Sequence, residues 1–194
     1  MELARQGFTM RIIAGTLKNR IFRSPKGKGT RPALALIRRM IFDTIQPFIM
    51  DSEILDLFAG SGAFVFEGIS RGAKKATAID LDHRVISVLK SNAENLRISD
   101  LIETYPADAL KAIPGLAQAK RKFDLIFVAP PYFKELTQKS LKLLDKIPLS
   151  GKNGIIIAQL HKKEKMDLSF SNLELFKTKK HGITIIQFYR YING

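Results

Sequence analysis

From residue 52 onward, short apolar runs alternate with longer segments that carry apolar residues at helical spacing. The expected strands are 53–58, 75–80, 102–107, 123–129 and 154–160, and the expected helices are 63–71, 83–97, 108–117 and 133–146. Apolar strands with a helix between each pair are typical of a parallel sheet that helices cover on both faces. The alternation therefore predicts one α/β domain built on a parallel sheet.

The two ends of the chain follow a different pattern. Two β-prone runs flank the turn-forming residues 15–19, so a small hairpin is expected there, followed by a basic loop at 26–32 and a helix that Pro47 ends. Near the carboxyl end, residues 172–180 and 183–191 are expected to form an antiparallel hairpin at the edge of the sheet. We therefore divide the chain into an extension at 1–9, a basic appendage at 10–50 and a core at 51–194.

Charge is the most informative part of the composition. The 194-residue chain carries 32 Lys and Arg residues against 18 Asp and Glu, a net charge of +14. Residues 1–39 hold ten basic residues and one acid, which gives this arm a net charge of +9. Such an arm favours a polyanionic partner such as nucleic acid, the alternative being a solvated basic surface. The side chains expected to contact an RNA backbone are Arg11, Lys18, Arg20, Arg23, Lys26, Lys28 and Arg31.

Two absences narrow the class of protein. The chain has no cysteine, which excludes disulfides and thiolate metal sites and suits a reducing cytoplasm. No apolar run reaches the roughly 18–20 residues that a membrane-spanning helix needs. We expect a cytoplasmic monomer with no membrane role and no bound metal.

A glycine-containing turn follows the first expected strand of the core. Gly60 permits a sharp turn, and Gly62 permits a ligand to approach the backbone closely. A dinucleotide site would need a third small residue where the chain has Val65 and Phe66, and a phosphate-binding loop would need a Gly-Lys-Ser/Thr sequence that is absent. The remaining pattern, Asp-x-Phe-x-Gly-x-Gly at residues 56–62, is similar to the first motif of S-adenosylmethionine-dependent methyltransferases.

Acidic residues follow the next two expected strands. Asp80 ends strand 75–80, where a carboxylate is able to accept hydrogen bonds from both ribose hydroxyls, and Asp82 is expected to cap the following helix. Asp108 and Ala109 follow the third strand, where enzymes of this kind contact the adenine. Alone, Asp108 is equally typical of a helix cap, so its position in the series carries the interpretation.

Several segments together resemble the RsmD family, bacterial enzymes that methylate the N2 amino group of a guanine in 16S ribosomal RNA. They are "MRIIAGTLKNR" at 10–20, Arg31-Pro32, "LDLFAGSGA" at 55–63 and "SRGA" at 70–73, and the resemblance extends over residues 10–191. It implies the class I methyltransferase fold, a seven-stranded sheet of order 3-2-1-4-5-7-6 with strand 7 antiparallel. It also implies S-adenosyl-L-methionine as the cofactor and 16S ribosomal RNA, in the small subunit or its precursor, as the partner.

The resemblance also assigns residues. The cofactor-binding residues that it implies are Asp56, Phe58, Ala59, Gly60, Gly62, Asp80, Leu81, Asp108 and Ala109, and the catalytic corner that it implies is Ala129, Pro130, Pro131 and Tyr132. Glu67 stands where the family has a glutamate after the glycine turn. We expect it to brace the loop or the helix rather than to act as a base.

The chain departs from the family most clearly at Ala129. Enzymes that methylate exocyclic amines keep Asp or Asn directly before Pro-Pro-Tyr/Phe, and the side-chain oxygen accepts one N–H of the target amine. Here Pro130 keeps its carbonyl and Tyr132 its aromatic face, but Ala129 has no acceptor. Removal of one preorganised hydrogen bond of this kind typically costs about 10²–10³ in rate. Glu135 is a conceivable substitute, although a solvated helix residue is its simpler interpretation.

Two functions therefore stay open, ahead of a third, the methylation of DNA or of a small molecule, the latter of which the basic arm disfavours. The first is an RNA guanine-N2 methyltransferase that acts on the small ribosomal subunit or its precursor. The second is a catalytically weakened factor in ribosome assembly that binds S-adenosylmethionine and RNA. Activity on precursor subunits, with and without Ala129→Asp, separates the two.

Overall fold

The computed structural model of the protein describes residues 8–25, 32–164 and 169–192. Within these ranges the helices are α1 Pro32–Ile45, η2 Gln46–Phe48, α2 Ala63–Ser70, α3 His83–Leu96, η3 Ser99–Leu101, α4 Ala109–Gln118 and α5 Leu136–Lys146. The strands are β1 Thr9–Arg11, β2 Ile21–Arg23, β3 Glu53–Asp56, β4 Lys75–Asp80, β5 Ile102–Pro106, β6 Phe123–Val128, β7 Ser150–His161, β8 Leu173–His181 and β9 Thr184–Tyr191. No helix of the described chain is long and apolar enough to cross a membrane.

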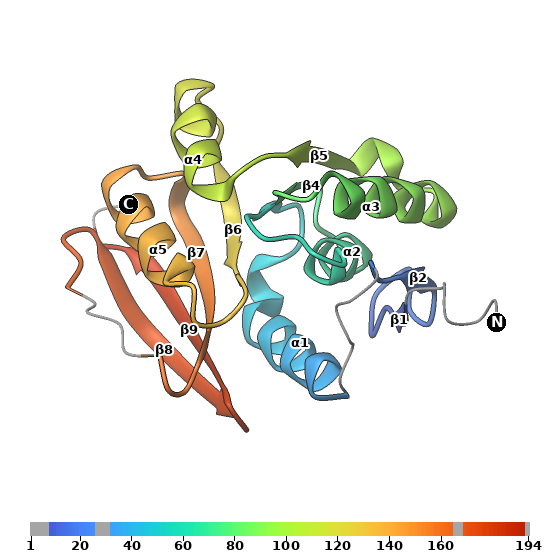
Figure 1. Cartoon of the computed structure of the whole chain (residues 1–194), viewed down its shortest axis with the longest axis horizontal. Helices are drawn as coiled ribbons and strands as arrows, with labels where there is room; N and C mark the ends of the chain where they lie inside the picture. Colours follow the sequence, from blue (N-terminus) through green and yellow to red (C-terminus); the bar gives the residue numbers. More distant parts are fainter. Residues whose placement is uncertain (1–7, 26–31, 165–168, 193–194) are drawn as a thin grey trace.

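Seven strands of the described chain form one sheet in the order β5-β4-β3-β6-β7-β9-β8 (Figure 1). Strands β3 to β7 pair in parallel, whereas β9 runs antiparallel to both β7 and β8. Numbered along the chain from β3, this is the order 3-2-1-4-5-7-6 that the resemblance implies. The predicted α/β fold is confirmed.

The sheet buries an apolar cluster on each face because successive strand residues point to opposite sides. Ile54, Leu125 and Phe127 belong to the cluster that α1, α2 and α3 cover, and Leu55 and Ile126 belong to the cluster that α4 and α5 cover. This alternation explains why the core strands are apolar throughout, and it fixes which face a residue at a strand end joins.

Backbone constraints around 129–135 displace two expected boundaries. Strand β6 ends at Val128 because the two prolines that follow lack the N–H needed for sheet pairing. Helix α5 begins at Leu136 instead of 133, since Phe133 and Glu135 have left-handed φ values of 61° and 55°. The segment between them is therefore a separate loop at the end of a central strand.

The N-terminal hairpin of β1 and β2 is anchored to α2. Gly15 has a φ of 84°, and a Cβ at this position would lie 1.7 Å from the Ser70 carbonyl oxygen, so only glycine fits this approach. The Thr16 N–H donates to the same carbonyl at 2.7 Å. Ile12 and Phe22 join the cluster on the α1–α3 face. The hairpin and the sheet thus share one core.

Candidate cofactor and substrate site

A cavity of about 560 Å³ opens at the carboxyl ends of the parallel strands. Its walls are the segments after β3, β4, β5 and β6, together with residues of α1 and α2. The reversal of strand order beside β3 leaves a crevice of this kind in doubly wound α/β sheets. The volume lies within the roughly 300–1,000 Å³ of small-molecule sites.

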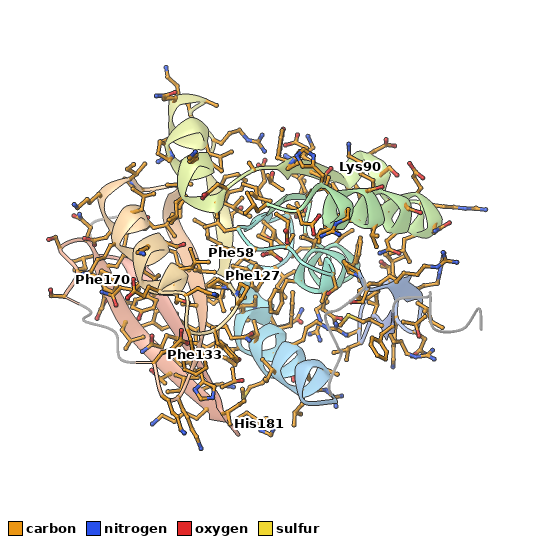
Figure 2. All side chains as sticks on the ribbon, in the orientation of Figure 1. Phe58, Lys90, Phe127, Phe133, Phe170 and His181 are labelled. Atoms are coloured by element: carbon orange, nitrogen blue, oxygen red, sulfur yellow. The ribbon has the colours of Figure 1, made fainter. Side chains whose placement is uncertain are left out.

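The glycine turn after β3 forms one wall of the cavity. Phe58, Ala59 and Gly60 line it, and Figure 2 shows the labelled Phe58 near the centre of the molecule. Gly60 has a φ of 51° and Gly62 a φ of 77°. A Cβ on Gly62 would lie 2.6 Å from the Phe66 ring. Both this close contact and the left-handed backbone conformation therefore require glycine at position 62. Gly62 is not among the residues that line the cavity, and its role as a point of ligand approach stays a prediction.

Asp56 has a different position from the one expected of a cofactor-binding residue. Its side chain is fully buried, and Oδ1 accepts a hydrogen bond from the Phe58 N–H at 3.1 Å. It is absent from the cavity wall. Asp56 therefore braces the turn that carries Phe58, and its direct contact with a cofactor stays a prediction.

Asp80 lies at the end of β4 and lines the cavity. Oδ2 accepts a hydrogen bond from the Gly60 N–H at 2.9 Å, and Oδ1 accepts one from the Asp82 N–H at 3.0 Å. The carboxylate thus ties the ends of two strands together. Each carboxylate oxygen is able to accept more than one hydrogen bond, so this bracing is compatible with ligand hydroxyls at the same group.

Three further predicted residues lie on the same side. Leu81 is 71% exposed and lines the cavity, although an exposed leucine is costly without a ligand over it. Asp108 accepts from the Leu110 N–H at 2.8 Å and so caps α4, while Asp108 and Ala109 also line the cavity. Asp82 caps α3 through the Arg84 N–H, as predicted. Asp108 thus both caps helix α4 and lines the cavity.

The corner after β6 forms the opposite wall. All four corner residues, Ala129 to Tyr132, line the cavity. The Tyr132 hydroxyl is 2.8 Å from Thr184 Oγ1 and accepts from Gln159 Nε2 at 3.0 Å. The next residue, Phe133, is tied by its N–H to Glu164 Oε1 at 2.7 Å. These contacts fix the ring of Tyr132 at the cavity wall.

Glu135, the conceivable substitute for the missing acceptor, lies away from the cavity. The Glu135 side chain is 77% exposed and pairs with Lys139 at 3.1 Å, one helical turn on. It does not line the cavity. Polar residues outside the predicted set also line it, among them Arg38 from α1 and Gln159 from β7. Their sequence surroundings are ordinary helix and strand, so only the three-dimensional arrangement reveals them.

Glu67 joins the appendage to the core. Its buried carboxylate accepts from the N–H groups of Ile13 and Ala14 at 2.9 and 3.1 Å, and from Arg71 Nε at 2.9 Å. Arg38 Nε lies 3.4 Å from Glu67 Oε2, and its guanidinium also donates to the Arg11 carbonyl. Burial lowers the pKa of Arg38, and the attraction of Glu67 opposes that shift. Glu67 braces the hairpin loop, as predicted.

The predicted RNA contacts divide into two groups. The side chains of Arg11, Lys18, Arg20 and Arg23 are exposed on the hairpin. Arg11 Nη1 donates to the Asn19 carbonyl and Arg20 Nη2 to the Asn95 carbonyl, each at 3.0 Å. Lys26, Lys28 and Arg31 lie outside the described residues. The hairpin therefore presents basic groups to solvent, one of which, Arg20, also contacts α3.

Comparisons with known proteins agree with this arrangement. The profile of the family described as conserved hypothetical protein 95 matches residues 10–190. The ribosomal RNA small subunit methyltransferase D of Haemophilus influenzae is 33% identical over 185 residues, 93% of each chain. The structure of the Escherichia coli protein yhhF superposes with a TM-score of 0.85 at 27% identity, over 96% of this chain and all of that one.

A more distant structure shares the fold alone. The T. thermophilus 16S rRNA N2 G1207 methyltransferase RsmC, solved with AdoMet and guanosine, has a TM-score of 0.71 at 17% identity, over 96% of this chain and 50% of that one. The family match spans nearly the whole chain, and the fold and the cavity at its strand ends are those of a class I methyltransferase. The chain belongs to the RsmD family of class I methyltransferases.

Proposed function

We propose that the protein transfers a methyl group from S-adenosyl-L-methionine to the exocyclic N2 amino group of a guanine in 16S ribosomal RNA, in the small subunit or its precursor. The observation that carries the proposal is the shared cavity. The glycine turn, Asp80 and the Pro-Pro-Tyr corner line one space, so that a cofactor and a target base meet there. Membership of the RsmD family supports the same reaction.

The cofactor fits the groups around the cavity. Asp80 accepts the ribose hydroxyls, and the turn at Phe58 to Gly60 lies against the methionine part. Leu81 and Asp108 flank the adenine, where an exposed leucine supplies apolar surface. When bound, S-adenosylmethionine supplies an electrophilic methyl group on a sulfonium. A related fold holds AdoMet and guanosine in the T. thermophilus enzyme.

The corner positions the target amine. The Pro130 carbonyl accepts one N–H of the amine, and the Tyr132 ring stacks on the flipped base. A base that stacks on an aromatic side chain gains about 1–3 kcal/mol. With the hydroxyl of Tyr132 held by Thr184 and Gln159, the ring does not turn away from the base. The nitrogen lone pair is thereby directed at the methyl group.

Transfer of a labelled methyl group tests the proposal. Small ribosomal subunits from a strain that lacks the gene are incubated with the protein and methyl-labelled S-adenosylmethionine, and modified guanines are mapped by mass spectrometry. We expect one guanine of 16S RNA to gain a single methyl group at N2. A methyl group on another atom, or on another RNA, contradicts the proposal.

Ala129 favours a second candidate, the catalytically weakened assembly factor, which in its silent form binds S-adenosylmethionine and precursor RNA and aids assembly without methylating. This candidate predicts cofactor binding and an assembly defect on deletion, but no transfer with any form of the subunit. Measured turnover by the natural protein excludes it.

A further inference from the structure

We infer that Gln159 supplies the hydrogen-bond acceptor that Ala129 lacks, so that Gln159 Oε1 and the Pro130 carbonyl hold the two N–H groups of the target amine. The inference rests on the proposed methylation of an exocyclic amine. It makes Gln159 a catalytic residue that the motif at 129–132 does not contain.

Register places Gln159 beside Ala129. Strands β6 and β7 pair in parallel, and the last matched pair is Val128 with Ala158, so Ala129 and Gln159 follow side by side. Val128 and Ala158 belong to the cluster on the α4–α5 face. Their successors therefore point to the other face, where both line the cavity. Neighbouring strands lie about 4.8 Å apart, a gap that the two methylenes of glutamine are able to span.

Hydrogen bonds fix which end of the amide faces the cavity. Gln159 Nε2 donates to the Tyr132 hydroxyl at 3.0 Å, and that hydroxyl is 2.8 Å from Thr184 Oγ1. One of the two N–H groups of the amide nitrogen is thus taken up by the corner itself. Within the described part of the chain, Gln159 Oε1 accepts no hydrogen bond. The oxygen remains as an acceptor in a side chain that lines the cavity.

The carboxylates nearby are less suitable acceptors. Glu135 is exposed and paired with Lys139. Asp80 lies at the end of β4, which is separated from β6 by β3. Two strand spacings are about 10 Å, too far for a hydrogen bond to an amine at the corner. Asp108 belongs to the segment after β5, one strand farther still.

A neutral amide suits this chemistry. As the bond from N2 to the methyl carbon forms, the bond from that carbon to sulfur breaks and the sulfonium becomes a thioether. The proton then shed by nitrogen passes to water, so the acceptor needs only to orient the N–H and stabilise the positive charge that develops on nitrogen. A carboxamide oxygen does both, although less strongly than a carboxylate.

The central test is Gln159→Ala, assayed with small ribosomal subunits from the deletion strain. We expect kcat to fall about 10²-fold, as for loss of one preorganised hydrogen bond, with the affinity for S-adenosylmethionine unchanged within twofold. Gln159→Glu keeps an acceptor oxygen and should stay within tenfold of the parent. The matched control is Gln187→Ala on β9, because Gln187 also bonds a tyrosine hydroxyl, that of Tyr189, but does not line the cavity.

A rescue experiment separates catalysis from structure. If Gln159 fills the place of the missing aspartate, Ala129→Asp should raise kcat at least tenfold more in the Gln159→Ala protein than in the parent. Equal gains in both backgrounds, or a Gln159→Ala protein as fast as the parent, overturn the inference while methylation itself stands. A parent that transfers no methyl group to guanine N2 overturns the proposed function and this inference together. Thermal unfolding of each variant identifies a loss that comes from misfolding.

Discussion

Asp80 is the residue on which cofactor affinity should depend most. Asp80→Ala removes a charged acceptor from the ribose and releases the Gly60 N–H that the carboxylate holds. Hydrogen bonds to charged groups contribute about 1.5–3 kcal/mol, which corresponds to an affinity for S-adenosylmethionine that is roughly 10–150-fold lower. Titration calorimetry measures this directly.

The neighbouring carboxylate provides the control. Asp82 caps α3 and pairs with Arg84, and it is absent from the cavity wall. Asp82→Ala should cost about 1 kcal/mol of stability because the helix cap is removed, and it should leave cofactor affinity unaltered. Equal affinities in the Asp80→Ala and Asp82→Ala proteins would contradict the assignment of Asp80.

For single residues of the candidate site, the sequence identifies those at strand ends well and those that become neighbours across two strands poorly. Asp80, Asp108 and Tyr132 are predictable because parallel strands bring their carboxyl ends to one edge, so position along the chain is enough. Gln159 depends on the register between β6 and β7 and on its bond to Tyr132. The cofactor contact expected of Asp56 stays a prediction, because a motif does not say whether a carboxylate faces a ligand or its own backbone, and Oδ1 accepts from the Phe58 N–H.

Among the elements, the junction of the hairpin with α2 depends on Glu67. Glu67→Gln leaves Arg38 and Arg71 buried without a full counter-charge, and it weakens the hydrogen bonds from the N–H groups of Ile13 and Ala14. Removal of one partner of a buried ion pair typically costs about 3–5 kcal/mol. Denaturant unfolding should show a decrease in stability of that size.

An exposed glutamate on α3 serves as the control for this prediction. Glu94→Gln changes charge by the same amount at an exposed position, and should alter stability by less than about 0.5 kcal/mol. Hydrogen exchange adds a local measure, because the amides of Ile13 and Ala14 should exchange faster in Glu67→Gln alone. Unchanged exchange at both amides would mean that the hairpin is held by its apolar contacts.

For whole elements, apolar patterning is a reliable guide and boundaries are not. The alternation of strand and helix predicts each core element, because both faces of the sheet are buried. The helical spacing of apolar residues extends back to 133, so the sequence predicts a start there. The observed start of α5 is Leu136, because Phe133 and Glu135 have left-handed backbone conformations. Backbone conformation of this kind is set by the contacts of the loop, such as the bond from Phe133 to Glu164, and no local pattern encodes it.

Over the whole molecule, the distribution of charge should govern RNA affinity. The net charge is +14, and Arg11 and Arg20 of the hairpin donate to backbone carbonyls rather than to any carboxylate of the described residues. Lysine and arginine side chains that bind phosphate release counterions, so the logarithm of the binding constant falls linearly with the logarithm of salt concentration. Lys18→Ala/Arg23→Ala should weaken binding to small subunits and reduce the slope by about 0.7–0.9 for each phosphate that is no longer neutralised.

A second double variant, far from the hairpin, tests whether RNA affinity depends on where the positive charges lie or only on their total number. Lys142→Ala/Lys146→Ala also removes two positive charges, but from α5. This helix covers one face of the sheet, whereas the hairpin residues Ile12 and Phe22 pack in the apolar cluster on the other face. If the hairpin grips the RNA backbone, the slope decreases only in the Lys18→Ala/Arg23→Ala protein, and both variants bind S-adenosylmethionine normally. Equal decreases in the two variants would show that the protein is attracted to RNA by its overall charge, and the hairpin would then be a solvated basic surface that does not touch the RNA.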